Sequence, residues 1–481
     1  MKNTNLVKLL RVLTTRERSR FKEFVFSPFF NKNEKLKLLC VAVLHHAPSF
    51  EHDGILKVKI FRKVFGEQAF DERRLNNYIS FLLQLLYDFL AQLRYEQKAV
   101  MQKNYLLEEL LERDQHHQME KNARKYRQLQ DASPLRNYEH YLQEYNYYDK
   151  MDRYVQRKIE RRFDDNLQRQ SDNLDLFYFG NKLRLACEMA SRNTVIKAGY
   201  EPQFLNELLQ FYESNTEEFK NIPALKLYYK TLQMLRGEDA IKYYHEVKAL
   251  LANHSALFPK VELYTLYYLA LNFCIKKINS GWGSYYREVL DLYKVLLEKK
   301  IIFLNGYLTQ WTYKNIITAG IRLKEFDWTE NFIQQFKDSL LPEDQYNATT
   351  YNLAALYYAR QEYKKALHLL FDVEFTDTSY HLGAKIIQLK SYYELDETEA
   401  FYALIEAFRK FITRNRQVGD YRKKANGNFL KIAKKVYQLK QDQNHLNRTK
   451  FQKKYLALQA QVAVLEPLAN KDWLQEVMAK F

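Results

Sequence analysis

Glycine and proline are scarce in this chain. Its 481 residues include 12 glycines and 8 prolines, about a third of the usual share of these two residues. Most tight turns depend on one of them, so a fold with many turns or long structureless connections is excluded. The sequence therefore predicts an all-α protein with short connections between its helices.

Cysteine is almost absent. The three cysteines, Cys40, Cys187 and Cys274, lie far apart among leucines and aromatic residues. A disulfide framework needs more cysteines, whereas isolated cysteines in apolar segments are typical of buried free thiols in a reducing compartment. This pattern favours a cytoplasmic protein.

No long apolar run is present either. The longest one, Tyr78 to Leu93, contains Gln84 and Asp88 and is too short to span a membrane. The first one, Leu6 to Leu13, is interrupted by lysine and arginine and has no small-residue cleavage site after it, unlike a secretory signal. We therefore expect no membrane partner.

Familiar catalytic motifs are missing. The chain has no GxxxxGK[ST] loop and no GxSxG elbow, and Gly281-Trp282-Gly283 is a lone GxG that predicts a turn. Neighbouring residues on a helix point apart, so the histidine and carboxylate doublets cannot share a metal or a proton. We expect no metal, no cofactor and no enzyme activity, while a hydrolase or transferase with a site assembled from distant helices stays open. The doublets are His45-His46, His116-His117, Asp164-Asp165 and Glu108-Glu109.

The helical pattern divides the chain into four parts. They are an N-terminal helical unit, a polar helical connector, a repeat array and basic capping helices, at residues 1–100, 101–132, 133–411 and 412–481.

The N-terminal unit contains two clear helix signals. Thr14 and Glu17 have the spacing of a capping box, which predicts that a helix starts there. A long helix is predicted over Asp71 to Gln97. Its middle is apolar on most sides, so we expect it to be buried as the spine of this unit; the residues concerned are Leu82, Leu83, Leu85, Leu86, Phe89 and Leu90.

A partial repeat with a period of 34 residues marks the array. The segment YNLAALYYARQEYKKA covers residues 351–366. Its last residue, Ala366, and the following Leu370 recur 34 residues later as Ala400 and Leu404. The first unit resembles the tetratricopeptide repeat at the small and large positions where paired helices meet: Leu353, Ala354, Tyr357, Ala366 and Leu370. It departs from that pattern at Thr350 and Thr378, where the repeat has tryptophan and proline. The resemblance implies a solenoid of helical hairpins, an architecture that mediates contacts with proteins or peptides.

Two shorter segments carry a second likeness. SPFFN at Ser27 to Asn31 and KDWL at Lys471 to Leu474 look similar to a group of uncharacterised bacterial helical-repeat proteins of about this length. The likeness brings no known activity, and from it we expect the chain to be one complete protein.

Aromatic residues make up 15% of the chain, and many tyrosines occur as doublets within the array. A doublet on a helix points its rings about 100° apart, so it can fill both the groove within a hairpin and the groove to the next hairpin. We expect most rings to pack in the core and the remainder to line a concave, tyrosine-rich surface. Base stacking on such rings is the alternative hypothesis.

Basic residues are concentrated near the end of the chain. Residues 409–454 contain fifteen basic residues and two acidic ones, Asp420 and Asp442, in a protein whose total net charge is +17. On a helix, Phe429, Ile432 and Val436 share one face, and five lysines cluster on the opposite face. This lysine face is a candidate surface for an acidic protein or for sequence-independent binding of nucleic acid, and a solvated capping helix is the plain interpretation. Its residues are Lys423, Lys424, Lys431, Lys434 and Lys435.

These features lead to one main hypothesis and two alternatives. We expect a non-catalytic, cytoplasmic helical-repeat scaffold that binds a helix or extended peptide of another protein. The first alternative is a nucleic-acid-binding protein that uses the basic C-terminal helices. The second is a regulator with an N-terminal DNA-binding helical unit, suggested by a smaller basic group at Arg11, Arg16, Arg18, Arg20, Lys22, Arg73 and Arg74.

Overall fold

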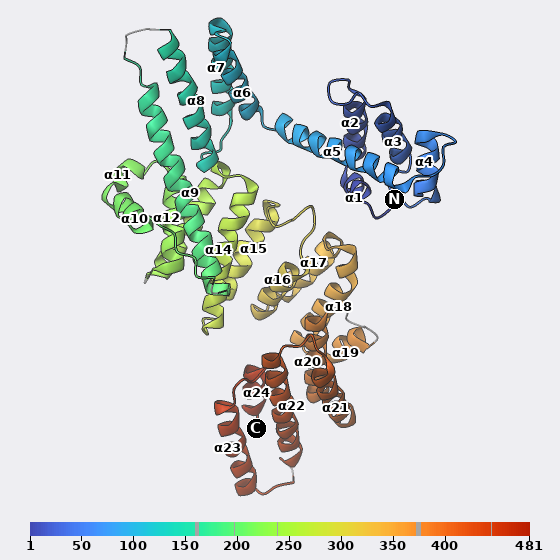
Figure 1. The fold of residues 1–481 in the computed structure, drawn as a ribbon. Helices are drawn as coiled ribbons and strands as arrows, with labels where there is room; N and C mark the ends of the chain where they lie inside the picture. Colours follow the sequence, from blue (N-terminus) through green and yellow to red (C-terminus); the bar gives the residue numbers. More distant parts are fainter. Residues whose placement is uncertain (159–162, 197, 238, 372–376, 444) are drawn as a thin grey trace. The chain divides into compact units, whose positions relative to one another are not determined.

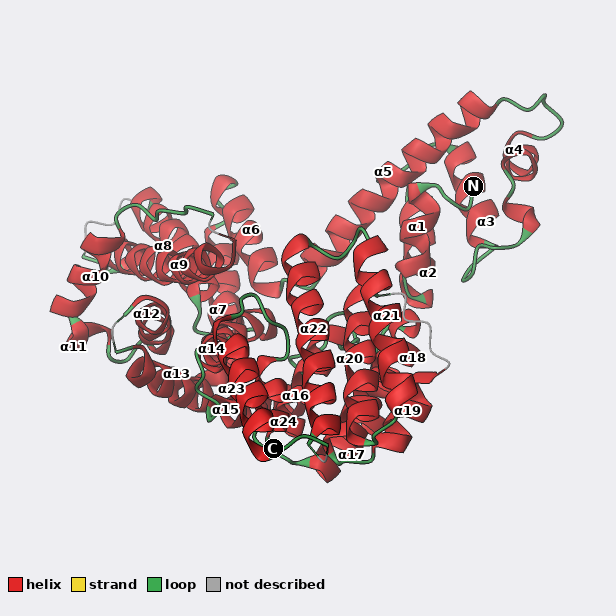
Figure 2. Ribbon diagram, turned by 90° about the horizontal axis from the view of Figure 1, so that it is seen from below, coloured by secondary structure: helices red, strands yellow, loops and turns green. Residues whose placement is uncertain are grey.

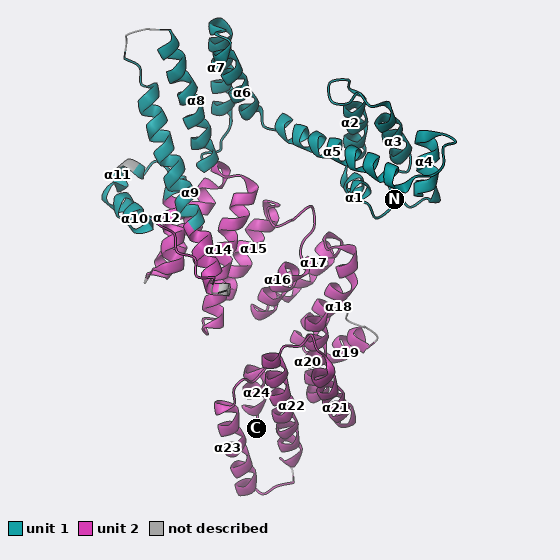
Figure 3. Cartoon of the chain, in the orientation of Figure 1, with its two compact units in different colours: residues 1–185, 204–225 teal, residues 186–203, 226–481 magenta. Residues whose placement is uncertain are grey.

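Helices form most of the described residues, as the sequence predicts. The computed structural model describes residues 1–158, 163–196, 198–237, 239–371, 377–443 and 445–481. Within these residues every regular element is a helix, apart from one isolated bridge between Leu304 and Tyr307 (Figures 1 and 2). The chain divides into two compact units (Figure 3): residues 1–185 with 204–225, and residues 186–203 with 226–481.

The first five helices share one apolar core. The capping box is confirmed, because the Thr14 hydroxyl accepts from the Glu17 amide and the Glu17 carboxylate accepts from the Thr14 amide. The helices are α1 (Asn5–Val12), α2 (Thr15–Phe26), α3 (Glu34–Leu44), α4 (Lys57–Phe65) and α5 (Glu72–Glu96).

Helix α5 is buried along one stripe rather than on most sides. Leu82, Leu86 and Phe89 are buried in this core, as predicted, but Leu83, Leu85 and Leu90 are only half-buried beside it. The other helices of this core pack against one side of α5, so the remaining apolar side chains have less cover. The expectation of a fully buried spine is therefore wrong for these three leucines.

The segment predicted as a polar connector forms a packed hairpin. Helices α6 (Ala99–Glu112) and α7 (His116–Ala132) pack against each other, and α6 also packs against α8 (Tyr138–Arg157). Leu107, Leu111 and Met119 bury their side chains with Tyr126 and Tyr147 in a core of their own. Helix α9 (Asn166–Ile196) follows, and then come α10 (Leu205–Ser214), α11 (Thr216–Phe219) and α12 (Pro223–Arg236).

From α13 onward the helices pack in a sequential, repeat-like manner. Each of the neighbouring pairs from α13 to α23 is in contact, and α16, α18 and α20 also contact one another in turn. Small residues allow this close approach, since a methyl group at Gly320 would overlap the hydroxyl of Thr329 on the next helix. The helices are α13 (Ala240–His254), α14 (Lys260–Asn279), α15 (Tyr285–Glu298), α16 (Gln310–Arg322), α17 (Phe326–Phe336), α18 (Pro342–Ala359), α19 (Tyr363–Phe371), α20 (Thr378–Glu394) and α21 (Thr398–Arg414).

The last three helices close a core with α20 and α21. They are α22 (Asp420–Asp442), α23 (Arg448–Val464) and α24 (Lys471–Met478). Trp473 of α24 packs edge-on against Tyr393 and against Phe429, and Tyr437 stacks on Phe401. No described helix is both long and apolar enough to cross a lipid bilayer.

Candidate interaction surfaces

Aromatic rings from alternate helices meet on one side of the second unit. Tyr264 and Tyr268 of α14 stack with centroids 6.2 Å apart. Trp311 of α16 stacks on Tyr380 of α20 at 5.7 Å with planes 5° apart, and Tyr351 of α18 meets the same tyrosine edge-on at 4.9 Å. We call these five residues the aromatic row.

A cavity lies between the α14 tyrosines of the aromatic row and Trp311. Its volume is 270 Å³, and it lies among α14, α15 and α16. Tyr268 and Trp311 both line it, and two of its rings are open to solvent, with 51% of Tyr268 and 45% of Trp311 exposed. The amide side chains of Asn272 and Asn315 supply hydrogen-bonding groups in the same wall. The cavity therefore combines apolar surface with polar groups, as sites for peptide side chains do.

One cation lies within the aromatic row. The Nζ of Lys314 is 4.8 Å from the ring centroid of Tyr351, 5.2 Å from that of Tyr380 and 6.0 Å from that of Trp311. Burial lowers the pKa of Lys314, the nearby Arg422 acts in the same direction, and Asp377 opposes them. The rings hold this ammonium group by cation–π attraction.

The lysine face of α22 is mostly open to solvent. Lys424, Lys431, Lys434 and Lys435 are exposed, and Lys423 is half-buried. The opposite face is buried, as its pattern predicts, with Phe429, Ile432, Val436 and Leu439 at most 3% exposed.

Acidic partners are scarce around this face. Across the described ranges, none of its five lysines forms an ion pair. Asp442 binds Lys454 of α23 at 2.7 Å, and Asp420 lies in the first turn of α22, where it stabilises the helix dipole. Lys435 donates to the side-chain oxygen of Gln461 at 2.8 Å, and Lys434 lies 5.7 Å from the Tyr402 ring centroid.

The residues predicted at repeat-packing positions lie in or beside helix contacts. Ala354, Ala366, Leu370 and Leu404 are buried, whereas Leu353, Tyr357 and Ala400 are half-buried. The Tyr357 hydroxyl donates to Glu330 of the preceding helix at 3.2 Å.

The carboxylate doublets considered for catalysis form ion pairs with lysine or arginine. Glu108 pairs with Lys150 at 3.1 Å and with Arg153 at 2.9 Å, and Asp165 pairs with Arg169 at 2.6 Å. Among the described residues, no group of three or more histidine, cysteine, aspartate or glutamate side chains has the geometry of a metal site. Gly281-Trp282-Gly283 lies in the turn between α14 and α15.

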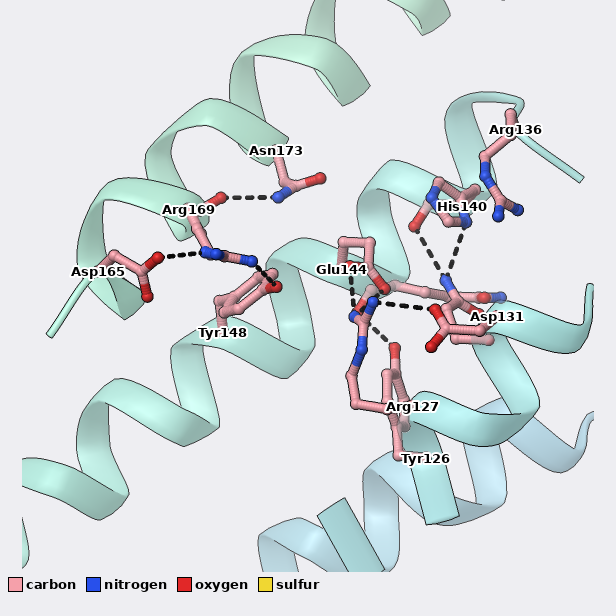
Figure 4. Close-up of polar contacts among 12 residues, drawn as sticks. Tyr126, Arg127, Asp131, Arg136, His140, Glu144, Tyr148, Asp165, Arg169 and Asn173 are labelled. Carbon is pink, nitrogen blue, oxygen red and sulfur yellow. Dashed lines mark hydrogen bonds and ion pairs between the residues drawn. The ribbon is translucent and has the colours of Figure 1, made fainter. Parts of the chain in front are cut away.

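A polar cluster of the first unit fixes helices to one another (Figure 4). Arg127 of α7 binds the carboxylate of Glu144 on α8 at 2.6 Å, and the Tyr126 hydroxyl donates to the Gln143 carbonyl at 2.7 Å. Gln130 lies 3.1 Å from the Nδ1 of His140. Each of these groups has a partner within the cluster, so the arrangement holds α7 against α8.

Several N-terminal basic residues also make internal contacts. Arg11 pairs with Glu51, Arg18 donates to the Leu13 carbonyl at 2.6 Å, and Arg20 pairs with Glu96 at 2.6 Å. Arg16 and Arg73 are exposed.

Sequence reasoning missed most of the aromatic row. Only Tyr268 belongs to a tyrosine doublet. Nothing in the local sequence connects Trp311 of α16 with Tyr380 of α20, whose helices are two hairpins apart. These aromatic residues lie on alternate helices, and that placement could have identified them. Recognising it would have required the boundaries of each helix to be predicted first.

Comparison of the chain with protein-family models, with curated proteins and with solved structures gives no match.

Proposed function

We propose that this chain is a non-catalytic helical-repeat scaffold, built as a tetratricopeptide-like solenoid, that binds a helix or extended peptide of another protein. The observation that carries the proposal is the exposed part of the aromatic row, Tyr268 of α14 and Trp311 of α16, because these rings come from alternate helices. Tyr380 of α20 is fully buried and stacks on Trp311. In helical-repeat solenoids, alternate helices line one surface and hold an elongated partner. Rings such as Tyr268 and Trp311 offer large contact areas with few rotamers to freeze.

Affinity purification from native lysate, with nuclease present, tests this proposal. The tagged wild-type chain is compared with a double variant, Tyr268→Ala with Trp311→Ala. The matched control replaces a tryptophan and a tyrosine of similar exposure outside the aromatic row, Trp282→Ala with Tyr346→Ala, which are 51% and 66% exposed.

We expect a nuclease-resistant protein partner that the wild type and the control recover and that the aromatic-row variant loses. The partner is then titrated against the three purified chains, each checked for helical content by circular dichroism. Equal affinity for all three would contradict the assignment of the aromatic row.

A second candidate function is sequence-independent binding of nucleic acid by the basic C-terminal helices. It is favoured by one observation, the exposure of four lysines on α22 without ion-pair partners among the described residues. Lysine contacts with phosphates give affinity that falls steeply with salt.

A further inference from the structure

An exposed aromatic ring, Tyr421, lies in the first turn of α22, between the lysine face and the buried face. At 100° per residue, Lys424, Lys431 and Lys435 lie within about 40° of one another on α22, and Tyr421 lies within about 80° of all three. Tyr421 is 75% exposed, whereas Tyr393 and Tyr437 of the adjoining core are at most 3% exposed. We call Tyr421, Lys424, Lys431 and Lys435 the α22 stripe. It extends for about 21 Å along the helix.

A cavity lies at the other end of the α22 stripe. It has a volume of 320 Å³ and is formed by α22 and α23, which run side by side. Leu439 and Leu458 form apolar walls, Gln438 and Gln461 provide amides, and Lys435 belongs to both the cavity and the stripe. The ion pair of Asp442 with Lys454 also lines the cavity, so the carboxylate there is neutralised by a lysine. This lining can take a flat, partly polar group that carries hydrogen-bonding edges.

The three components match the chemistry of a single nucleic-acid strand. A row of lysines follows a phosphate backbone, and an exposed aromatic ring stacks on a base whatever its identity. A cavity with apolar walls and amide groups can hold a second base. Duplex nucleic acid hides its bases in the stack, so it could use the lysines but neither the tyrosine ring nor the cavity.

We propose that the α22 stripe and the adjoining α22–α23 cavity bind single-stranded nucleic acid without sequence preference. Phosphates contact Lys424, Lys431 and Lys435, one base stacks on Tyr421, and another enters the cavity. This inference rests on the second candidate function. It adds that the ligand is single-stranded, and it names the residues that contact the strand.

Fluorescence anisotropy with the full-length chain tests the proposal. The probe is a labelled oligothymidylate of about twelve nucleotides, titrated at several salt concentrations, and a labelled duplex of equal length is titrated in parallel. The charge variant replaces three lysines of the stripe: Lys424→Gln, Lys431→Gln and Lys435→Gln. Its matched control removes the same charge from exposed lysines of α13, α14 and α19 through Lys242→Gln, Lys260→Gln and Lys364→Gln.

We expect the charge variant to bind the single strand about tenfold or more weakly than the wild type and to reduce the salt slope by about 2. The control should bind within about twofold of the wild type. Equal losses in both triple variants would mean that net charge, and not this stripe, holds the strand, and would overturn the proposal.

A second variant separates single-strand binding from general attraction of anions. Tyr421→Ala should weaken single-strand binding by about fivefold or more and leave duplex binding unchanged, because only an unpaired base can stack on the ring. Tyr346→Ala, which removes an exposed tyrosine from α18, should change neither. Unchanged binding by Tyr421→Ala, together with equal competition by polyglutamate, would replace the proposal with a site for acidic proteins. No binding of either oligonucleotide by the wild type would reject the second candidate function itself.

Discussion

Thr329 of α17 occupies the space beside Gly320 of α16, and its hydroxyl lies 2.2 Å from the position that a Cβ on that glycine would take. The Thr329 hydroxyl also donates to the Glu325 carbonyl at 2.7 Å, which fixes its position. Two helices of one hairpin therefore touch at a point where one of them has no side chain.

Gly320→Ala should destabilise this hairpin by about 1–3 kcal/mol, because the added methyl group forces the two helices apart. Hydrogen exchange of α16 and α17 amides in the full-length chain measures the effect locally. Thr329→Ala should restore part of the loss in the double variant, since it removes the overlapping hydroxyl. Additive losses in the double variant would show that the contact is not the cause.

Arg127→Met should destabilise the contact between α7 and α8 by about 2 kcal/mol, because it leaves the buried carboxylate of Glu144 without its cation. The Glu144 side chain is only 8% exposed, whereas Arg127 is one-third exposed. Arg113→Met removes an open pair with Glu109 and should cost less than about 1 kcal/mol. Because the chain has two compact units, amide exchange of α7 and α8 is a better measure than one global unfolding transition. Equal effects of the two substitutions would contradict this account.

The first unit should lose stability as the pH falls from 7 to 5. Burial lowers the pKa of His140 to about 4, with Arg136 and Arg127 acting in the same direction and Asp131 opposing them. Unfolded histidine titrates near pH 6.5, so between about pH 6.5 and 4 the unfolded chain binds a proton that the folded chain does not. His140→Gln should reduce the pH dependence of α7 and α8 exchange, and His445→Gln, at an exposed position, should not. A pH dependence that His140→Gln leaves unchanged would assign it to other groups.

The three cysteines should resist alkylation in the folded chain. All three are buried and form no disulfide, and burial raises the pKa of both Cys40 and Cys274 to about 12. Thiolate is the reactive form, so iodoacetamide at pH 8 should label few of them until denaturant is added. Mass spectrometry of the labelled chain counts the modified residues, and rapid labelling without denaturant would contradict the described burial.

Local signals in the sequence predicted local structure well. Thr14 and Glu17 form the capping box at the predicted helix start, because a capping box needs only residues three positions apart. The amphipathic pattern of α22 likewise predicted which side is buried, since period alone determines the face. The all-α class followed from the scarcity of turn residues.

Features that depend on neighbouring helices could not be predicted in the same way. Leu83 and Leu85 of α5 are as hydrophobic as Leu82 and Leu86, and only the placement of the other helices decides which pair is buried. The contact of Trp311 with Tyr380 depends on how α16, α18 and α20 pack against one another, so no short sequence pattern predicts it. Tyr421 was not part of the predicted lysine face, because its position on the helix lies in line with the buried Leu439, and only the structure shows that its ring is exposed.

The core of α1 to α5 uses only residues from the first hundred of the chain. Its contacts close short loops, so forming them has a small entropic cost and does not wait for distant segments. During synthesis this part can reach its final packing while the α22 stripe has yet to be translated. The growing chain thus completes an ordered body at its start before the most basic segment emerges.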